Sequence, residues 1–182
     1  GDVTQTKQQE EVLRLTNMRL DAALDNMTQG LLLFDADGRL EVVNRRYIEI
    51  FGLPPDQIGP GKTFLELLET SIASGNHPGR TPEEMLAEQQ EFLRNDPIGV
   101  RLMDIGNRII SCAYRPTEAG GWVATYEDVT ERRQAETKIM HMARHDALTN
   151  LPNRVLFRET MEEALNRDDR FAVLFLDLDR FK

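Results

Sequence analysis

Residues 26–53, NMTQGLLLFDADGRLEVVNRRYIEIFGL, decide the fold of this chain. An apolar run at 30–35 is followed by Gly38, which adopts positive φ at little cost, and by a returning apolar run at 39–44. Two such runs joined by a short glycine-containing turn are typical of a β-hairpin. We therefore predict a hairpin over 30–43 whose first strand is buried.

A short helix is expected directly after the hairpin. Asn44 is a residue type that favours the N-cap position, and the segment RRYIEIFG follows it at 45–52. Gly52 and Pro54 are residue types that end helices. This stretch thus predicts strand, turn, strand and capped helix in one continuous run.

Two longer helices are expected next, over 62–74 and 82–94. The second carries a complete start signal. Thr81 can act as N-cap, Pro82 occupies the first helical position, and Glu84 completes a capping box.

Three strand candidates follow these helices, at 98–106, 108–116 and 121–129, with glycine-containing turns between them. The order is therefore two strands, then helices, then three strands. Such an order is typical of the α+β class, with an antiparallel sheet of five strands and the helices gathered on one face.

Helices with apolar stripes are expected on both sides of this mixed domain, over 4–27 and 130–145. The apolar positions are Leu13, Leu20 and Met27 in the first helix and Ala135, Ile139 and Met142 in the second. Each stripe could cover its own domain or pair with its copy in a homodimer. We expect a parallel homodimer, and the sequence leaves the alternative open.

The residues from 146 onward begin a further unit. A turn-rich stretch is followed by an amphipathic helix over 155–167 and by FAVLFLD at 171–177, a strand apolar enough to lie inside a sheet. So short a segment cannot build a core of its own, and we expect it to be the first part of a larger domain.

The expected domain plan therefore has four parts. They are an N-terminal linker helix at 1–27, the mixed domain at 28–129, an exit helix at 130–145, and the start of a further domain at 146–182.

Composition excludes several classes of protein. The 182 residues are 40% hydrophobic and 29% charged, which suits a globular protein, and the net charge of −9 disfavours nucleic-acid binding. No apolar run approaches the ~20 residues that span a bilayer. The single cysteine, Cys112, agrees with a reducing compartment, so we expect a cytoplasmic location. A membrane anchor upstream stays open.

Residues 27–130 resemble a PAS domain. The resemblance rests on the stretch quoted above and on DVTER at 128–132. In PAS domains the corresponding Asp-Val-Thr closes the last strand and passes a signal into the exit helix. The resemblance thus implies that Asp128, Val129 and Thr130 transmit the signal.

Residues 145–182 resemble the first part of a GGDEF domain, through HDALTNLPNR at 145–154 and LDLDRFK at 176–182. Intact GGDEF domains make cyclic di-GMP from two molecules of GTP with the help of Mg²⁺. The site residues that the resemblance implies are Asp177 with the Leu178 carbonyl for the metal, and Arg180, Phe181 and Lys182 for the triphosphate. On a strand, Asp177 and Asp179 would project to one face, about 6–7 Å apart.

The Gly-Gly-Asp/Glu-Glu-Phe signature of that family occurs nowhere in the 182 residues. We therefore expect no catalytic residue and no enzymatic activity in this stretch by itself. In the intact family, two protomers each hold one GTP and each 3′-hydroxyl attacks the other's α-phosphate. A degenerate GGDEF domain, or an additional phosphodiesterase domain, stays open as an alternative.

The sequence does not identify a PAS ligand. Cys112 lies in a strand candidate rather than in the Asn-Cys-Arg context of flavin adducts, so it is read as a core residue. His77 lies in a Gly/Pro-rich loop and is expected to be exposed. His141 and His145 share a helix face, where a metal pair or pH-sensitive patch is less favoured than a solvated surface. The aromatic candidates for core or pocket walls are Phe34, Phe51, Phe64, Tyr114, Trp122 and Tyr126.

These resemblances imply a sensory module that relays a signal through a helix to a diguanylate cyclase domain. The alternative is a dimerisation module that binds no ligand and holds two catalytic domains together. A small molecule in the PAS domain and a second copy of the chain are the expected partners.

Overall fold

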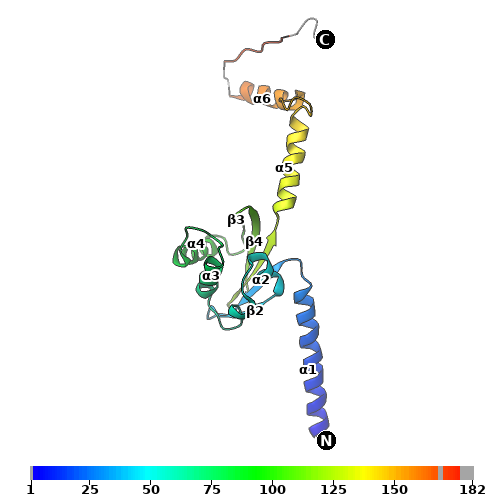
Figure 1. Cartoon of the computed structure of the whole chain (residues 1–182), viewed down its shortest axis with the longest axis vertical. Helices are drawn as coiled ribbons and strands as arrows, with labels where there is room; N and C mark the ends of the chain where they lie inside the picture. Colours follow the sequence, from blue (N-terminus) through cyan, green and yellow to red (C-terminus); the bar gives the residue numbers. More distant parts are fainter. Residues whose placement is uncertain (1, 168–169, 177–182) are drawn as a thin grey trace. The chain divides into compact units, whose positions relative to one another are not determined.

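The computed structural model describes residues 2–167 and 170–176, and these contain an antiparallel sheet of five strands (Figure 1). The strands lie in the order β2-β1-β5-β4-β3. Their bounds are Gly30–Phe34 for β1, Leu40–Val43 for β2, Val100–Ile105 for β3, Arg108–Pro116 for β4 and Trp122–Asp128 for β5. The expected α+β class and five-stranded sheet are confirmed.

Helices cover one face of the sheet (Figure 1). They are α2 (Arg45–Phe51), α3 (Phe64–Ala73) and α4 (Pro82–Asn95), with a 3₁₀ turn, η1, at Pro55–Gln57 between the first two. Buried residues of the strands, of α2 and of α3 form one continuous hydrophobic core.

Alternation along the strands decides which side chains enter this core. In β1, Leu32 and Phe34 are buried while their neighbours are partly exposed. In β4 the same alternation buries Ile110, Cys112 and Tyr114. A period of two places every second side chain on one sheet face, so these residues point toward the helices.

The predicted hairpin forms as expected. Gly38 has φ 73° in the turn, a value that glycine adopts without strain. The carboxylate of Asp35 accepts hydrogen bonds from the backbone N–H groups of Asp37 (2.9 Å) and Arg39 (2.8 Å). The turn is therefore stabilised by its own side chain.

The predicted helix caps are also present. Thr81 and Glu84 form a capping box at α4, with a proline in the first turn. Thr63 and Glu66 form a second box at α3, which the sequence analysis did not single out. Each box satisfies backbone N–H groups that a helix start leaves unpaired.

Asn44 does more than cap α2. Its Oδ1 accepts hydrogen bonds from the backbone N–H groups of Tyr47 (3.1 Å) and Leu31 (2.8 Å). Its Nδ2 donates to the carbonyls of Leu24 (3.0 Å) and Gln29 (2.9 Å). The side chain is 1% exposed. One buried amide thus joins α2, β1 and the last turn of the helix before the sheet.

That preceding helix, α1 (Asp2–Asp25), is largely exposed where its side chains are described. Its stripe residues Leu13 and Leu20 are 61% and 56% exposed, whereas Met27, just beyond the helix, is partly buried. The two stripe residues within α1 are therefore not covered by their own domain. Along the described residues, none of the helices combines the length and apolar character needed to cross a bilayer.

The chain divides into two compact units, Gly1–Thr130 and Glu131–Lys182. The second contains nearly all of α5 (Thr130–Arg144) and all of α6 (Arg154–Asn166), the helices expected at 130–145 and 155–167. Neither helix buries a residue fully, and Ile139 and Met142 of the expected α5 stripe are both exposed.

The prediction of a strand at 171–177 is wrong for the residues of this segment that the structure describes. Residues 170–176 have no regular secondary structure, and Leu174, Phe175 and Leu176 are exposed. A strand needs a neighbour for its backbone N–H and C=O groups, and the described residues offer these none. Apolar character alone was not enough to form it.

Replacing Asn44 with alanine should lower the free energy of unfolding by about 3 kcal/mol, because it removes an N-cap and leaves buried backbone groups unpaired. Urea unfolding followed by circular dichroism would measure the change. Asn17→Ala, on the exposed surface of α1, is the matched control and should stay within about 0.5 kcal/mol of the wild type. Equal stabilities of the two variants would contradict the assigned role of Asn44.

Candidate functional site

A small cavity lies between the sheet and the helices. Its volume is about 30 Å³, and a cavity needs at least about 10–15 Å³ to hold one water. Its walls come from α2, α3, α4, the strands β3, β4 and β5, and the loop after α3. The lining residues include the aromatic side chains Tyr47, Phe51, Phe64, Tyr114 and Tyr126. Of the expected aromatic candidates, Phe34 and Trp122 lie outside this lining, stacked on each other.

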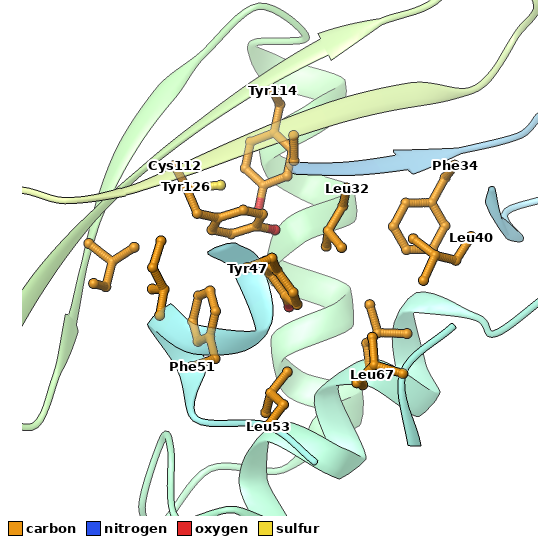
Figure 2. Close-up of a cluster of buried hydrophobic side chains, with 14 of the residues drawn as sticks. Leu32, Phe34, Leu40, Tyr47, Phe51, Leu53, Leu67, Cys112, Tyr114 and Tyr126 are labelled. Carbon is orange, nitrogen blue, oxygen red and sulfur yellow. The ribbon is translucent and has the colours of Figure 1, made fainter. Parts of the chain in front are cut away.

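Three tyrosines and a phenylalanine form most of the aromatic wall (Figure 2). The ring of Tyr47 lies 5.0 Å from that of Tyr126 and 4.8 Å from that of Phe51, measured between centroids. Figure 2 shows the hydroxyl ends of Tyr114 and Tyr126 next to each other. The Tyr47–Tyr126 pair is edge-to-face, an arrangement that adds stability beyond the buried area, and the Tyr47–Phe51 pair is tilted.

Burial keeps this wall electrically neutral. Burial raises the pKa of Tyr47, Tyr114 and Tyr126 well above the usual value of a phenol. Burial likewise raises the pKa of the Cys112 thiol from 9.0 to about 11, while hydrogen bonding with Tyr114 and Tyr126 opposes the shift. A charged form of any of these groups would lose its hydration, and at Cys112 and Tyr114 the positive charge of Arg101 offsets only part of that cost.

Two uncharged polar side chains also line the cavity. Ser71 of α3 and Gln89 of α4 line the cavity, and both residues are almost fully buried. Within the described part of the chain, Ser71 Oγ and Gln89 Nε2 have no hydrogen-bond partner. Sequence analysis missed both residues, because each lies on a helix face that reads as ordinary amphipathic pattern.

His77 is half-buried at the cavity, so the expectation that it is exposed was wrong. The neighbouring Asn76 is buried, and its Nδ2 donates to the Phe51 carbonyl at 2.7 Å. This bond holds the loop against the core and explains the exposure error. Burial, followed by the charges of Arg80 and Arg101, lowers the pKa of His77.

The other residues considered as ligand candidates, Cys112, His141 and His145, contact neighbouring side chains of the chain itself. Cys112 is fully buried in β4, which confirms it as a core residue. The rings of His141 and His145 stack with centroids 3.9 Å apart, and His141 Nε2 lies 2.6 Å from Asn150 Oδ1. Among residues 2–167 and 170–176, no three His, Cys, Asp or Glu side chains form a group that could hold a metal ion.

The end of the sheet is fixed to the start of α5 by short polar contacts. The Thr130 hydroxyl donates to Asp128 Oδ1 at 2.5 Å and accepts from the Ile109 N–H at 2.9 Å. The Thr130 N–H also donates to Asp128, and these bonds hold the pKa of that carboxyl below its usual value. Val129, between them, is 2% exposed and donates its N–H to the Ile109 carbonyl.

The HDALTNLPNR stretch forms a hydrogen-bonded turn between α5 and α6. Asp146 Oδ1 accepts from the N–H groups of Leu148 and Thr149 and from the Thr149 hydroxyl. Asn153 Oδ1 caps α6, and its Nδ2 donates to the Ala143 carbonyl at 2.8 Å. The polar residues of this motif therefore fix the connection between the two helices.

The expected GTP and metal residues cannot be placed in the same way. Asp177, Leu178, Arg180, Phe181 and Lys182 lie outside the described residues, as does Asp179. Their roles remain implications of the sequence resemblance.

Comparison with known families gives two matches along the chain. A family model described as the PAS fold matches residues 24–137. A second, described as the diguanylate cyclase GGDEF domain, matches residues 143–182. The first match covers the sheet, the cavity and the start of α5.

Several known proteins are similar to this chain. The cyclic di-GMP phosphodiesterase PdeR of Escherichia coli is 39% identical over 158 residues, which are 84% of this chain and 24% of that protein. The probable diguanylate cyclase DgcE of the same species is 26% identical over 190 residues, covering all of this chain and 17% of that protein. The solved PAS domain of Bordetella pertussis BvgS has a TM-score of 0.44 and 18% identity, over 69% of this chain and 94% of that domain.

The buried thiol gives a prediction for alkaline pH. Between about pH 9 and 11 the folded protein keeps the Cys112 proton while the unfolded chain loses it, so stability falls as pH rises. The difference in free energy of unfolding between the wild type and Cys112→Ala should therefore shrink by about 2 kcal/mol from pH 8 to pH 10.5. Denaturant unfolding at each pH would measure it. Both proteins contain the same buried tyrosines, so the tyrosines do not contribute to this difference. If the free energies of unfolding of the two proteins change in parallel with pH, the Cys112 thiol is not the cause of the loss of stability.

Proposed function

This chain belongs to the PAS fold family and continues into the start of a GGDEF domain, and from that membership we propose that it is the sensory and regulatory part of a cyclic di-GMP signalling protein. The PAS domain senses, α5 relays, and the GGDEF domain belongs to the output. Similarity to a diguanylate cyclase and to a cyclic di-GMP phosphodiesterase supports this assignment. The chain spans only a minor part of both relatives, so the activity of the whole protein is part of the proposal.

The observation that carries the proposal is the bonded junction at Asp128, Val129 and Thr130. β5 ends at Asp128 and α5 begins at Thr130, with Val129 as the one residue between. Because the Thr130 hydroxyl is bonded to both Asp128 and the β4 backbone, a shift of these strands displaces the first residue of the helix. The three residues are signal-transmission residues in this proposal.

The output chemistry requires GTP and Mg²⁺, as in GGDEF domains generally. The diguanylate cyclase activity belongs to the intact domain, and residues 1–182 alone are proposed to be inactive because the family signature is absent from them. A cytoplasmic location of this chain is part of the proposal, because the GTP that the output domain uses is made and kept in the cytoplasm. A phosphodiesterase output is the alternative that PdeR suggests.

A homodimer is the second part of the proposal. The exposed apolar residues of α1 and α5 supply surfaces that a second copy can cover. Short helical pairings are marginal alone, so contacts of the PAS domain must add to them. The small volume of the cavity favours, as a second candidate function, a dimerisation module that binds no ligand.

The dimer is tested by charged substitutions in the two stripes. Leu20→Glu and Ile139→Glu should each weaken self-association by about tenfold or more, because they put a carboxylate in a desolvated contact. Sedimentation equilibrium would measure the association. Gln8→Glu and Gln134→Glu add the same charge at exposed polar positions of α1 and α5 and should have little effect. A wild-type protein that stays monomeric at high micromolar concentration would refute the dimer.

The relay is tested by the helical phase of α5. A chimera would join residues 1–182 to the remainder of a GGDEF domain from an active diguanylate cyclase. Alanines would be inserted between Glu136 and Thr137, each turning the following residues by about 100°. Two or five should change the rate of cyclic di-GMP formation about fivefold or more, and seven, about two full turns, should restore it.

Residues 1–182 without the added domain serve as the blank, and with GTP and Mg²⁺ they should form no product. Rates that do not depend on the number of inserted residues would show that α5 is a passive tether. That result would refute the proposed relay through α5, whether or not the PAS domain binds a ligand.

A further inference from the structure

The internal cavity continues into a surface groove of about 410 Å³. His77, Met85, Arg101 and Met103 line both spaces, so the groove adjoins the cavity along this shared wall. A small molecule arriving through the groove would meet these side chains first. The chemistry of the shared wall therefore determines which molecules the cavity accepts.

The inner wall presents two hydrogen-bond donors without acceptors. Ser71 Oγ and Gln89 Nε2 are buried and unpaired within the described residues, and both residues line the cavity. Folded proteins pair nearly all buried polar groups, since each unpaired one costs about 1–3 kcal/mol. A hydroxyl and an amide N–H are both satisfied by an acceptor oxygen, so the wall is complementary to a ligand that brings one.

Arg101 supplies an uncompensated positive charge at the boundary between cavity and groove. Across the described chain its guanidinium forms no ion pair, and it lies over the ring of Phe92, 5.8 Å from the ring centroid. Asp104 lines the groove but not the cavity. Guanidinium groups prefer carboxylates, which they bind through two parallel hydrogen bonds.

The rest of the cavity wall is apolar or neutral. The tyrosines keep their protons because of burial, so they offer no competing negative charge. Their rings, with Phe51 and Phe64, suit the apolar body of a ligand. The small cavity volume restricts that body to a few atoms and does not suit haem or flavin.

We infer that this cavity binds a compact organic monocarboxylate, with the carboxylate on Arg101, Ser71 and Gln89 and the apolar body against the tyrosines. A carboxylate has about four lone-pair sites, enough for a two-bond contact with arginine and two further donors. The inference rests on the proposed sensory function and names the class of signal. It assigns roles to three residues that neither family resemblance singles out.

The test uses residues 1–182 with formate, acetate and propionate as probes, whose size suits the small cavity, and with formamide, acetamide and propionamide as their uncharged counterparts. Calorimetry gives the affinities, and NMR of ¹⁵N-labelled protein follows the Gln89 side-chain amide directly. At least one carboxylate should bind with a Kd of about 1 mM or lower and shift the Gln89 signal. Its amide should bind about tenfold more weakly, because it carries no charge for Arg101.

Matched variants separate a binding role from a structural one. Arg101→Gln should weaken carboxylate binding about tenfold and leave amide binding unchanged, and Arg115→Gln, at an exposed position of β4, should change neither. Gln89→Leu should raise the Tm of the free protein, because a buried unpaired donor is removed, and should weaken carboxylate binding. Arg101→Lys keeps the charge and serves if Arg101→Gln does not fold; it should bind the carboxylate more weakly than wild type.

The inference is overturned if no carboxylate of the series binds below about 10 mM, or if the arginine variants bind as tightly as the wild type. Such a failure would leave the relay intact, because the phase dependence of the α5 insertions requires no ligand. Loss of the phase dependence with retained carboxylate binding would instead refute the relay and keep the site.

Discussion

Asn44 is the point on which the arrangement of the PAS unit depends. A side-chain amide offers two donor hydrogens and an acceptor oxygen, and here it makes two bonds through each end. Those bonds reach α1, the entry to β1 and the start of α2 at once. Because the site is buried, losing one bond would leave a polar group unpaired in a low dielectric. A displacement of the last turn of α1 is therefore felt directly in the hairpin and in α2, whose Tyr47 and Phe51 line the cavity.

The titratable side chains buried on the helix-covered face of the sheet are uncharged. Alternation along the strands places Tyr114, Tyr126 and Cys112 on the helix-covered face, where burial keeps all three protonated. Among the described residues that line the cavity, Arg101 carries a charge and His77 is titratable. Among the buried side chains that the structure describes, Ser71 and Gln89 carry the unpaired polar atoms, and both residues line the cavity. Stability and binding thus place opposite demands on the same wall, since filling it with apolar atoms would remove its donors.

The two ends of the PAS unit use the same physical device. At the entry, one buried amide joins the helix to the sheet; at the exit, the Thr130 hydroxyl joins β4, β5 and the first residue of α5. Short polar side chains are suited to this task because they bond to backbone groups with few rotatable bonds between. Outside these junctions α1 and α5 expose apolar residues such as Leu20 and Ile139, which belong to the contact surfaces of the proposed homodimer.

The sequence by itself determined the local elements. The hairpin, the Asn44 cap, the Thr81–Glu84 capping box and both flanking helices follow from residues a few positions apart, because turns and caps are satisfied within their own segment. The strand order, the half-burial of His77 and the meeting of Ser71, Gln89 and Arg101 were decided only by the tertiary structure, because they join elements far apart in the chain. The strand predicted at 171–177 is absent over the described residues 171–176 for the same reason. An apolar run is a local feature of the sequence, whereas a strand forms only beside a neighbouring strand, which the run itself does not provide.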